Sequence, residues 1–166
     1  MSSWGKNNDY QTPKNYWSVQ EAKEKIQNFC AYQERCAWDV RRKLFEKGIP
    51  EKDIEDLLDF LNQEGYLDEE RFARSFARGK FRLKKWGKNR IQQELRMRKI
   101  SQASIRAGLE EIDPEEYYDT LLTQTEKKWE STLEKDLYKK RFKVIQYLMS
   151  RGFEQDLVQE AVGSLQ

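Results

Sequence analysis

The chain has 166 residues, and its 31 basic and 29 acidic side chains leave a net charge of +2 without a single histidine. The lack of histidine excludes Ser-His and Cys-His nucleophile systems, histidine metal ligands and a histidine general base. The two cysteines form no CxxC pair, and neither GxxxxGK[ST] nor GxGxxG occurs, which argues against a structural zinc site and a phosphate-binding loop. We therefore expect no catalytic activity, no metal and no cofactor.

The chain shows no sign of export or membrane insertion. No stretch approaches 18 consecutive apolar residues, which predicts that no helix spans a membrane. The first residues, MSSWGKNNDY, lack the apolar core of a secretory signal. The spacing of Cys30 and Cys36 leaves a disulfide bridge open, but without an export signal two reduced thiols are expected. These features predict a cytoplasmic protein.

The N-terminal segment differs from the rest of the chain. Residues 1–17 are polar and without periodicity, which predicts a disordered polar tail, although its two tryptophans and two tyrosines could dock on the protein. The first predicted helix begins after Ser18, because Ser18 and Glu21 have the spacing of a capping box and an apolar face follows them.

Three stretches repeat the same apolar spacing, which is the main signal for the fold. Aligned on Val40, Ile91 and Val144, apolar residues fall at offsets 0, 4, 9, 14, 18 and 21 in every copy. A step of 4 marks one helix face, the jump to 9 crosses a tight turn, and the later steps mark a second helix. Gly48 and Gly152 occupy the turn position where a positive φ is favoured.

A further helix is predicted before each of these helix pairs, because acidic residues stand at each expected start. After Asp68, Phe72 and Phe76 are expected to face inward. After Asp113, the expected inward residues are Tyr118, Leu121, Leu122 and Trp129. The prediction is an all-α fold of three tandem three-helix repeats in an elongated, curved body, with repeats at residues 18–65, 66–113 and 114–166.

Two motifs in the middle repeat carry a resemblance to a known family. EGYLDEERFA at residues 64–73, followed by WGKNRIQQEL at residues 86–95, resembles the core signature of the RecX family of bacterial recombination regulators. The segments VRRKL with KGI in the first repeat and LMSRGF in the third resemble the flanking repeats of that family. The resemblance covers residues 18–166 and implies three tandem three-helix repeats.

The chain departs from the family pattern at three positions. Cys36 and Gly87 stand where the family often has a Ser or Thr helix cap. Lys99 replaces the usual turn glycine of the middle repeat, so this turn is expected either to be strained or to close differently.

The resemblance implies a function. Members of the RecX family bind the RecA recombinase, insert along the RecA filament on DNA, and restrain filament growth, ATP hydrolysis and strand exchange. They act as regulators in DNA recombination, DNA repair and the SOS response, without a cofactor. A monomer is the simpler expectation for a protein that threads a filament groove. Two other functions stay open on the sequence: a stand-alone DNA-binding protein with helix-turn-helix-like units, and a helical-repeat adaptor for an unrelated protein.

Charge is segregated along the chain. Residues 51–70 carry nine acids and one base, whereas residues 71–100 carry twelve bases and one acid. The candidate contacts to RecA or DNA are the basic residues of the first part of that second stretch, namely Arg71, Arg74, Arg78, Lys80, Arg82, Lys84, Lys85, Lys88 and Arg90. A secondary basic cluster in the third repeat consists of Lys139, Lys140, Arg141 and Lys143.

The basic residues allow more than one interpretation. Either group could be a solvated helix face, and the first group could pair with the acidic segment that precedes it. Arginines repeated on one helix face suit bidentate contacts to phosphate or carboxylate, which favours a binding surface for DNA or for acidic surface of the recombinase. The interleaved aromatic residues are interpreted first as core, and Trp38 and Phe45 as packing between repeats.

Overall fold

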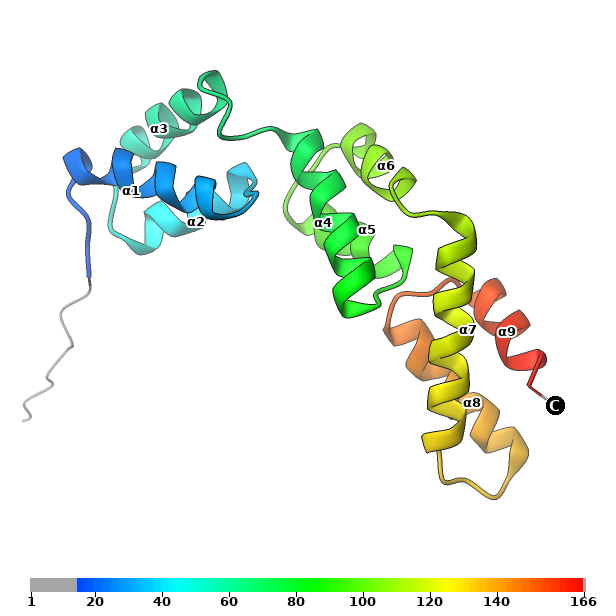
Figure 1. Cartoon of the computed structure of the whole chain (residues 1–166). Helices are drawn as coiled ribbons and strands as arrows, with labels where there is room; N and C mark the ends of the chain where they lie inside the picture. Colours follow the sequence, from blue (N-terminus) through cyan, green and yellow to red (C-terminus); the bar gives the residue numbers. More distant parts are fainter. Residues whose placement is uncertain (1–14, 166) are drawn as a thin grey trace, which may run out of the picture.

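The structure is a computed structural model that describes residues 15–165. All regular structure in these residues is helical (Figure 1). The helices, in chain order, are α1 (Val19–Tyr32), α2 (Ala37–Glu46), α3 (Glu51–Gln63), α4 (Glu69–Lys84), α5 (Lys88–Met97), α6 (Gln102–Glu110), α7 (Pro114–Ser131), α8 (Leu137–Ser150) and α9 (Gln155–Gly163). Successive groups of three pack together, which confirms the predicted three-helix repeats.

Side-chain caps explain where several helices begin. The Ser18 Oγ accepts from the backbone N–H of Glu21 at 3.2 Å, and the Glu21 carboxylate accepts from the Ser18 N–H at 2.8 Å. This is the predicted capping box, which satisfies N–H groups that have no partner inside the helix. Asp68, Asp113 and Asp136 cap α4, α7 and α8, and their negative charge also suits the helix dipole.

The turns between the second and third helices of the repeats share one backbone conformation. Gly48 and Gly152 have φ values of +78° and +98°, and Lys99 has φ +59° at the equivalent position. The turn therefore closes in the same way in all three repeats, and in the middle one a side chain is held in the left-handed region. That conformation costs an L-residue about 1–2 kcal/mol relative to its preferred region.

The buried apolar residues form two clusters rather than one for each repeat. One cluster lies within α1–α3 and the segment that follows, from Ala22 to Leu67. The other runs through α4–α9 without interruption and includes Cys36 from the first repeat. Among the positions of the predicted repeat pattern, Leu109 and Leu165 are half-buried and the others are buried.

The second and third repeats meet through their backbones. The N–H groups of Gly87 and Asn89, at the start of α5, donate to the carbonyls of Arg151 and Gly152 at 2.8 and 2.9 Å. A Cβ atom on Gly87 would overlap the backbone of Gly152. The carbonyl groups after α8 therefore accept the hydrogen bonds that a Ser or Thr side chain would accept at the start of α5. This explains why Gly87 can replace the Ser or Thr that the family often has at this position.

The first and second repeats meet through a much thinner junction. Trp38 packs against the cluster of α4–α9, which confirms its expected place between repeats. The Arg98 guanidinium lies 3.8 Å from the Asp39 carboxylate across this junction. Two hollows of about 380 Å³ each flank the contact. Phe45 is 74 % exposed, so the expectation that Phe45 packs between repeats is wrong: Phe45 lies on the outer face of α2.

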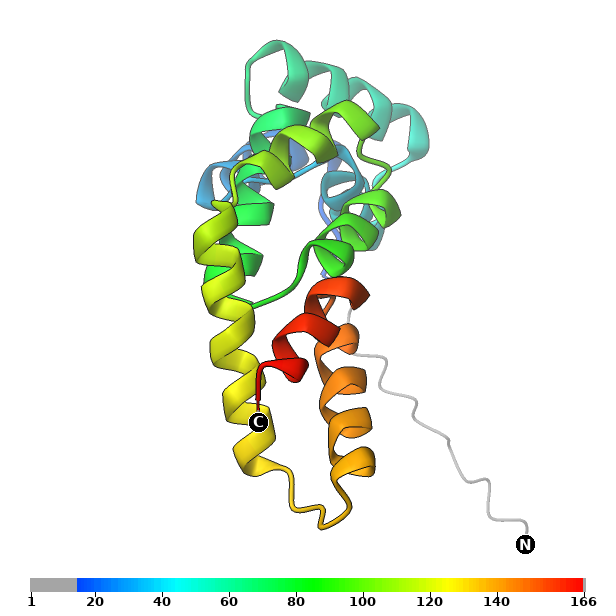
Figure 2. The ribbon, with the colours of Figure 1, turned by 90° about the vertical axis from the view of Figure 1, so that its right-hand side faces the viewer.

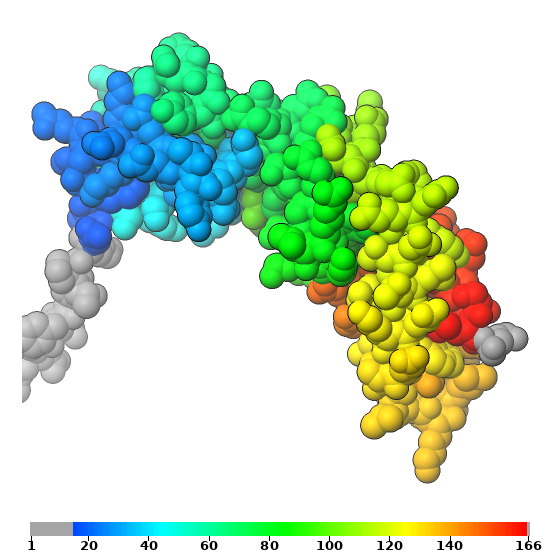
Figure 3. All heavy atoms as spheres, in the orientation of Figure 1, coloured from blue at the N-terminus to red at the C-terminus, as the bar shows by residue number. Residues whose placement is uncertain are grey.

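The described chain forms an elongated arch, as predicted (Figure 3). α1–α3 lie at one end, and at the other end α9 packs against both α7 and α8 (Figure 2). Of the predicted tail, residues 1–14 lie outside the described residues. Trp17 is described: its N–H donates to the Lys47 carbonyl at 3.0 Å, and it packs against the first cluster. None of the described helices is long and apolar enough to cross a membrane.

Candidate functional site

Three of the candidate basic residues lie at steps of three and four along α4, and we call Arg71, Arg74 and Arg78 the arginine ladder. Each of them contacts a carboxylate of this chain. The Arg71 Nε donates to Glu34 at 2.7 Å, and Glu34 belongs to the first repeat. Arg71 therefore links two repeats across the thin junction.

The other two members of the ladder converge on Glu111, at the end of α6. The Arg74 Nη1 lies 2.9 Å and the Arg78 Nη1 3.2 Å from the Glu111 carboxylate. Hydrogen bonds from Arg74 and then Arg78 lower the pKa of Glu111, because they favour its charged form. Arg74 also contacts Glu70 at 2.7 Å. The ladder is thus paired within the molecule, and of its carboxylate partners Glu34, Glu70 and Glu111 only Glu70 belongs to the acidic segment 51–70.

The remaining candidates of the middle repeat gather around the C-terminal end of α4 and the turn into α5. We call this group the turn cluster: Lys80, Arg82, Lys84, Lys85, Lys88 and Arg90. None of its members forms an ion pair with another residue in the range 15–165. Arg82 and Lys84 lie in the last turn of α4, where positive charge suits the helix dipole. The turn cluster is therefore the part of the basic run whose charge is available to a partner.

Aromatic rings orient part of the turn cluster. The Arg90 guanidinium lies 4.2 Å and the Lys80 Nζ 5.0 Å from the centre of the Trp86 ring. The Lys88 Nζ lies 4.9 Å from the Tyr117 ring. Cations attract the negative face of such rings while their N–H groups can still reach other partners. The aromatic residues of this region thus pack against the core and also form cation–π contacts with the turn cluster.

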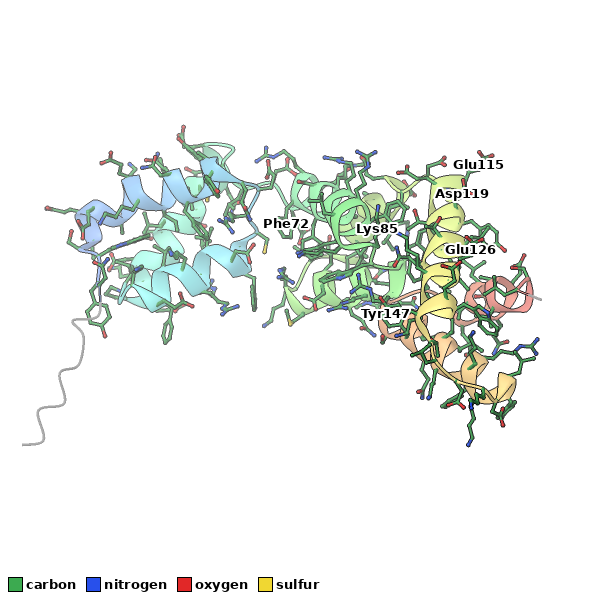
Figure 4. All side chains as sticks on the ribbon, turned by 60° about the horizontal axis from the view of Figure 1, so that its bottom comes forward. Phe72, Lys85, Glu115, Asp119, Glu126 and Tyr147 are labelled. Carbon is green, nitrogen blue, oxygen red and sulfur yellow. The ribbon has the colours of Figure 1, made fainter. Side chains whose placement is uncertain are left out.

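Lys85 has a different setting within the turn cluster. It ends α4 with φ +56° and is exposed. Figure 4 shows it near the start of α7, where Glu115 and Asp119 are also labelled. These residues line a shared hollow of about 470 Å³. The acidic start of α7 therefore reduces the positive potential around Lys85.

The secondary basic cluster lies on the first half of α8 and contains Lys139, Lys140, Arg141 and Lys143. The Lys143 Nζ lies 2.8 Å from the Glu134 carboxylate, and the Lys140 Nζ lies 4.4 Å from the Trp129 ring. Lys139 is exposed. Arg141 is half-buried and lines a hollow at this end of the molecule. The four residues therefore do not form one uniform surface.

Tyr117 is a buried polar residue that the sequence pattern did not identify. Its hydroxyl accepts from the Lys88 N–H at 3.0 Å and donates to the Glu154 carboxylate. Burial, followed by this bond to Glu154, raises the pKa of Tyr117. The residue connects the start of α5 in the second repeat to the start of α9 in the third. The only sequence signal for it is its spacing of four from Leu121.

The cysteines and carboxylates form no site of their own in the described part of the chain. No group of three or more His, Cys, Asp or Glu there could hold a metal ion. Cys30 and Cys36 are buried free thiols, and burial raises their pKa values to about 11 and about 12. The Cys36 Sγ donates to the Asp39 carboxylate at 3.3 Å, so Cys36 still forms a polar contact at the start of α2.

Comparison with known proteins identifies the family. Models of the first, second and third three-helix domains of RecX match residues 22–61, 68–109 and 115–162. The chain is 30 % identical over 125 residues to Regulatory protein RecX of Vibrio parahaemolyticus, covering 75 % of this chain and 79 % of that protein. This chain belongs to the RecX family.

Other relatives are longer than this chain. Regulatory protein RecX of Clostridium botulinum is 34 % identical over 125 residues, and the match covers 74 % of this chain and 58 % of that protein. The RecX proteins of the genus Clostridium thus contain further sequence beyond the matched region. These relatives are named as regulatory proteins.

Two solved structures share the fold. A crystal structure of regulatory protein RecX has a TM-score of 0.78 at 24 % identity, covering 86 % of this chain and 72 % of that one. The structure of RecX from Lactobacillus salivarius has a TM-score of 0.73 at 20 % identity, covering 89 % of this chain and 96 % of that one. The arrangement of repeats is therefore that of the RecX fold.

Proposed function

We propose that this chain regulates the RecA recombinase, mainly as an inhibitor that binds the RecA filament on DNA and restrains filament growth, ATP hydrolysis and strand exchange. Membership of the RecX family supports this function. The structural observation that carries it is the turn cluster, because its cations have no ion-pair partner among the described residues. The turn from α4 to α5 lies on the inner side of the arch (Figures 1 and 3).

The turn cluster suits a polyanion held on the inner side of the arch. A group of like charges without acidic partners repels itself, and a row of phosphates would remove that repulsion and release bound counterions. The arginine ladder does not serve this purpose, because its guanidinium groups already contact carboxylates of the chain. We therefore assign the DNA-facing contacts to the turn cluster and a role in holding the repeats to the ladder.

The further parts of the proposal concern the state of the protein. We propose that it acts in the cytoplasm as a monomer, without a cofactor or catalytic activity. One arched molecule presents its inner side without needing a second copy. Contacts to RecA itself then come from surfaces outside the turn cluster.

The test is the single-stranded-DNA-dependent ATPase of the cognate RecA, titrated with this protein at two salt concentrations. Inhibition at well below one molecule per RecA is the expected result. Inhibition only when the protein coats the DNA would indicate the alternative function of a stand-alone DNA-binding protein. No effect at any ratio would contradict a role on the filament. The remaining function would then be that of a helical-repeat adaptor for an unrelated protein.

A further inference from the structure

Arg141 on α8 has no polar partner in the described part of the chain. Its Nε is buried without a hydrogen bond, and none of its other atoms forms a hydrogen bond or ion pair within residues 15–165. Two other described side chains have a buried polar atom without a partner, but each is held through another atom: Glu34 by Arg71, and Arg151 by a backbone carbonyl. Buried donors without acceptors are uncommon because they lose their hydration without replacement. Arg141 is therefore a candidate contact for a ligand.

A hollow lies beside this arginine. Trp129, Leu137, Arg141 and Leu165 line a volume of about 560 Å³ between the end of α7, the start of α8 and the end of the described chain. Three of these four side chains are apolar, and the fourth presents a guanidinium fork, which matches a carboxylate. The chemistry of the hollow thus fits an apolar side chain that stands next to an acidic one.

The segment that carries Leu137 and Arg141 is rich in exposed apolar and basic side chains. Leu133 is 96 %, Tyr138 81 % and Phe142 54 % exposed. Several large exposed apolar side chains within one short segment are typical of contact surfaces between proteins. Nucleic-acid surfaces use flat rings for base stacking, and Tyr138 and Phe142 could supply them, but Leu137 and Leu165, which line the hollow itself, cannot stack in this way. A protein partner is therefore favoured over nucleic acid.

Charge indicates the kind of protein. The segment 133–143 contains five basic residues, of which Lys135, Lys139, Lys140 and Arg141 form no ion pair within residues 15–165, whereas Lys143 is paired with Glu134. The other acid of this segment, Asp136, caps α8. The complement of this surface is an acidic segment that also carries apolar side chains.

We propose that this end of the third repeat docks an acidic, apolar segment of a partner protein, with a carboxylate on Arg141 and a neighbouring apolar side chain in the hollow. The inference rests on the proposed function in taking RecA as that partner. It places the two contacts at different parts of the molecule: the turn cluster at the middle of the arch meets DNA, and the start of α8 meets protein.

The test is the variant Arg141→Met, which keeps the apolar stem and removes the donors. Because Arg141 makes no internal polar contact, its loss leaves the thermal midpoint equal to or above that of the unmodified protein. The concentration needed for half-inhibition of the RecA ATPase is expected to rise about ten-fold, since a charge-assisted contact is lost. Lys52→Met, at an exposed position on α3, makes the same change in charge and serves as the control.

A second variant keeps the inference testable if Arg141→Met folds poorly. Leu137→Asp changes an exposed side chain that lines the hollow and places a negative charge beside Arg141. It is expected to weaken inhibition by a similar factor, because the acidic segment is repelled. Inhibition by both folded variants at the concentration of the unmodified protein would overturn the site.

Two further readouts distinguish the occupant. Binding of a labelled oligo(dT) strand without RecA is expected to be unchanged in Arg141→Met, and a parallel loss would identify a phosphate site and overturn the protein-docking proposal. Light scattering after gel filtration measures the molar mass in solution. A dimer of the unmodified protein that dissociates in Arg141→Met would show that a second copy occupies the hollow, and would also overturn the proposal. If the unmodified protein fails to inhibit RecA at all, the proposed function has failed, which is a different result from equal inhibition by the variants.

Discussion

Lys99 adopts the left-handed conformation that the turn of each repeat requires, and this lowers the stability of the protein because lysine disfavours that conformation. Its φ of +59° matches the turns that Gly48 and Gly152 form in the other repeats. The buried residue that follows the turn, Ile100, anchors this geometry, because its N–H donates to the Leu95 carbonyl at 3.1 Å. Packing on both sides of the turn therefore outweighs the local preference of lysine.

Replacing Lys99 by glycine is expected to raise the free energy of unfolding by about 0.5–1 kcal/mol. The relief of left-handed backbone strain exceeds the added chain entropy of glycine in the unfolded state. Urea denaturation followed by circular dichroism measures the change. Gln93→Gly, at an exposed position inside α5, should instead lose about 1 kcal/mol. A loss for Lys99→Gly as well would contradict the strain argument.

At the scale of elements, the contact of α5 with the end of α8 determines how the second and third repeats are joined. The N–H groups at the start of α5 have no partners inside that helix, and the carbonyls at the end of α8 have none inside theirs. Bringing these ends together satisfies both sets, and the two helix dipoles align favourably. The absence of a side chain at Gly87 permits the approach.

Gly87→Ala is therefore expected to destabilise the protein by more than about 2 kcal/mol, since its methyl group forces the two backbones apart. Denaturation in urea measures the effect. Gly79→Ala is the matched control, because a Cβ atom at Gly79 meets no neighbouring atom and the change removes a glycine from the middle of α4. The control should gain about 0.5–1 kcal/mol. Similar values for the two variants would refute the close contact.

The elements also show what the sequence could and could not predict. The apolar spacing predicted the helix pairs, because each buried face follows a regular period of 3 or 4. The inward face of α7 was predicted in part: Leu121 is buried as expected, and Tyr118, Leu122 and Trp129 are half-buried against the core. The other buried residues of α7, Tyr117 and Thr125, were not predicted. The polar Thr125, whose hydroxyl donates to the Leu121 carbonyl, interrupts the apolar pattern and hides the period.

The candidate site was predicted less completely than the fold. Charge counts identified the basic run, but residues 37 positions apart decide which of its cations are free, as Glu34 and Glu111 show. Composition contains no signal for such pairings. Arg141 belongs to the predicted secondary cluster. That its Nε is buried without a hydrogen-bond acceptor can be seen only in the structure.

At the scale of the whole molecule, the two apolar clusters divide the arch unequally. α4–α9 share a continuous core, whereas α1–α3 have their own and meet the rest through Cys36, Trp38 and a few ion pairs. Exposed ion pairs contribute about 0–1 kcal/mol each and weaken with salt. The first repeat is thus less strongly coupled to the body than the third.

Native-state hydrogen exchange should reveal this asymmetry. Buried amides of α1–α3 are expected to exchange through an opening of lower free energy than those of α4–α9, because the first repeat can open without disrupting the larger core. Added salt should have little effect on opening within α4–α9 but should loosen the junction. Equal protection throughout the arch would show that the junction is as strong as the cores.

The central claim is that the turn cluster holds the DNA of the RecA filament, and neutralising its most exposed members tests it most directly. The triple variant Arg82→Gln, Lys84→Gln and Lys85→Gln is compared with Lys23→Gln, Lys52→Gln and Arg106→Gln, three exposed positions elsewhere with the same loss of charge. The measurement is filament binding and RecA ATPase inhibition as a function of salt.

We predict that the turn-cluster variant binds at least ten-fold more weakly and that the slope of log affinity against log salt becomes shallower by about 2, as expected for three lost contacts to a single strand. The control variant should retain the affinity and slope of the unmodified protein. A folded turn-cluster variant that inhibits RecA with unchanged affinity and unchanged salt dependence would contradict the account.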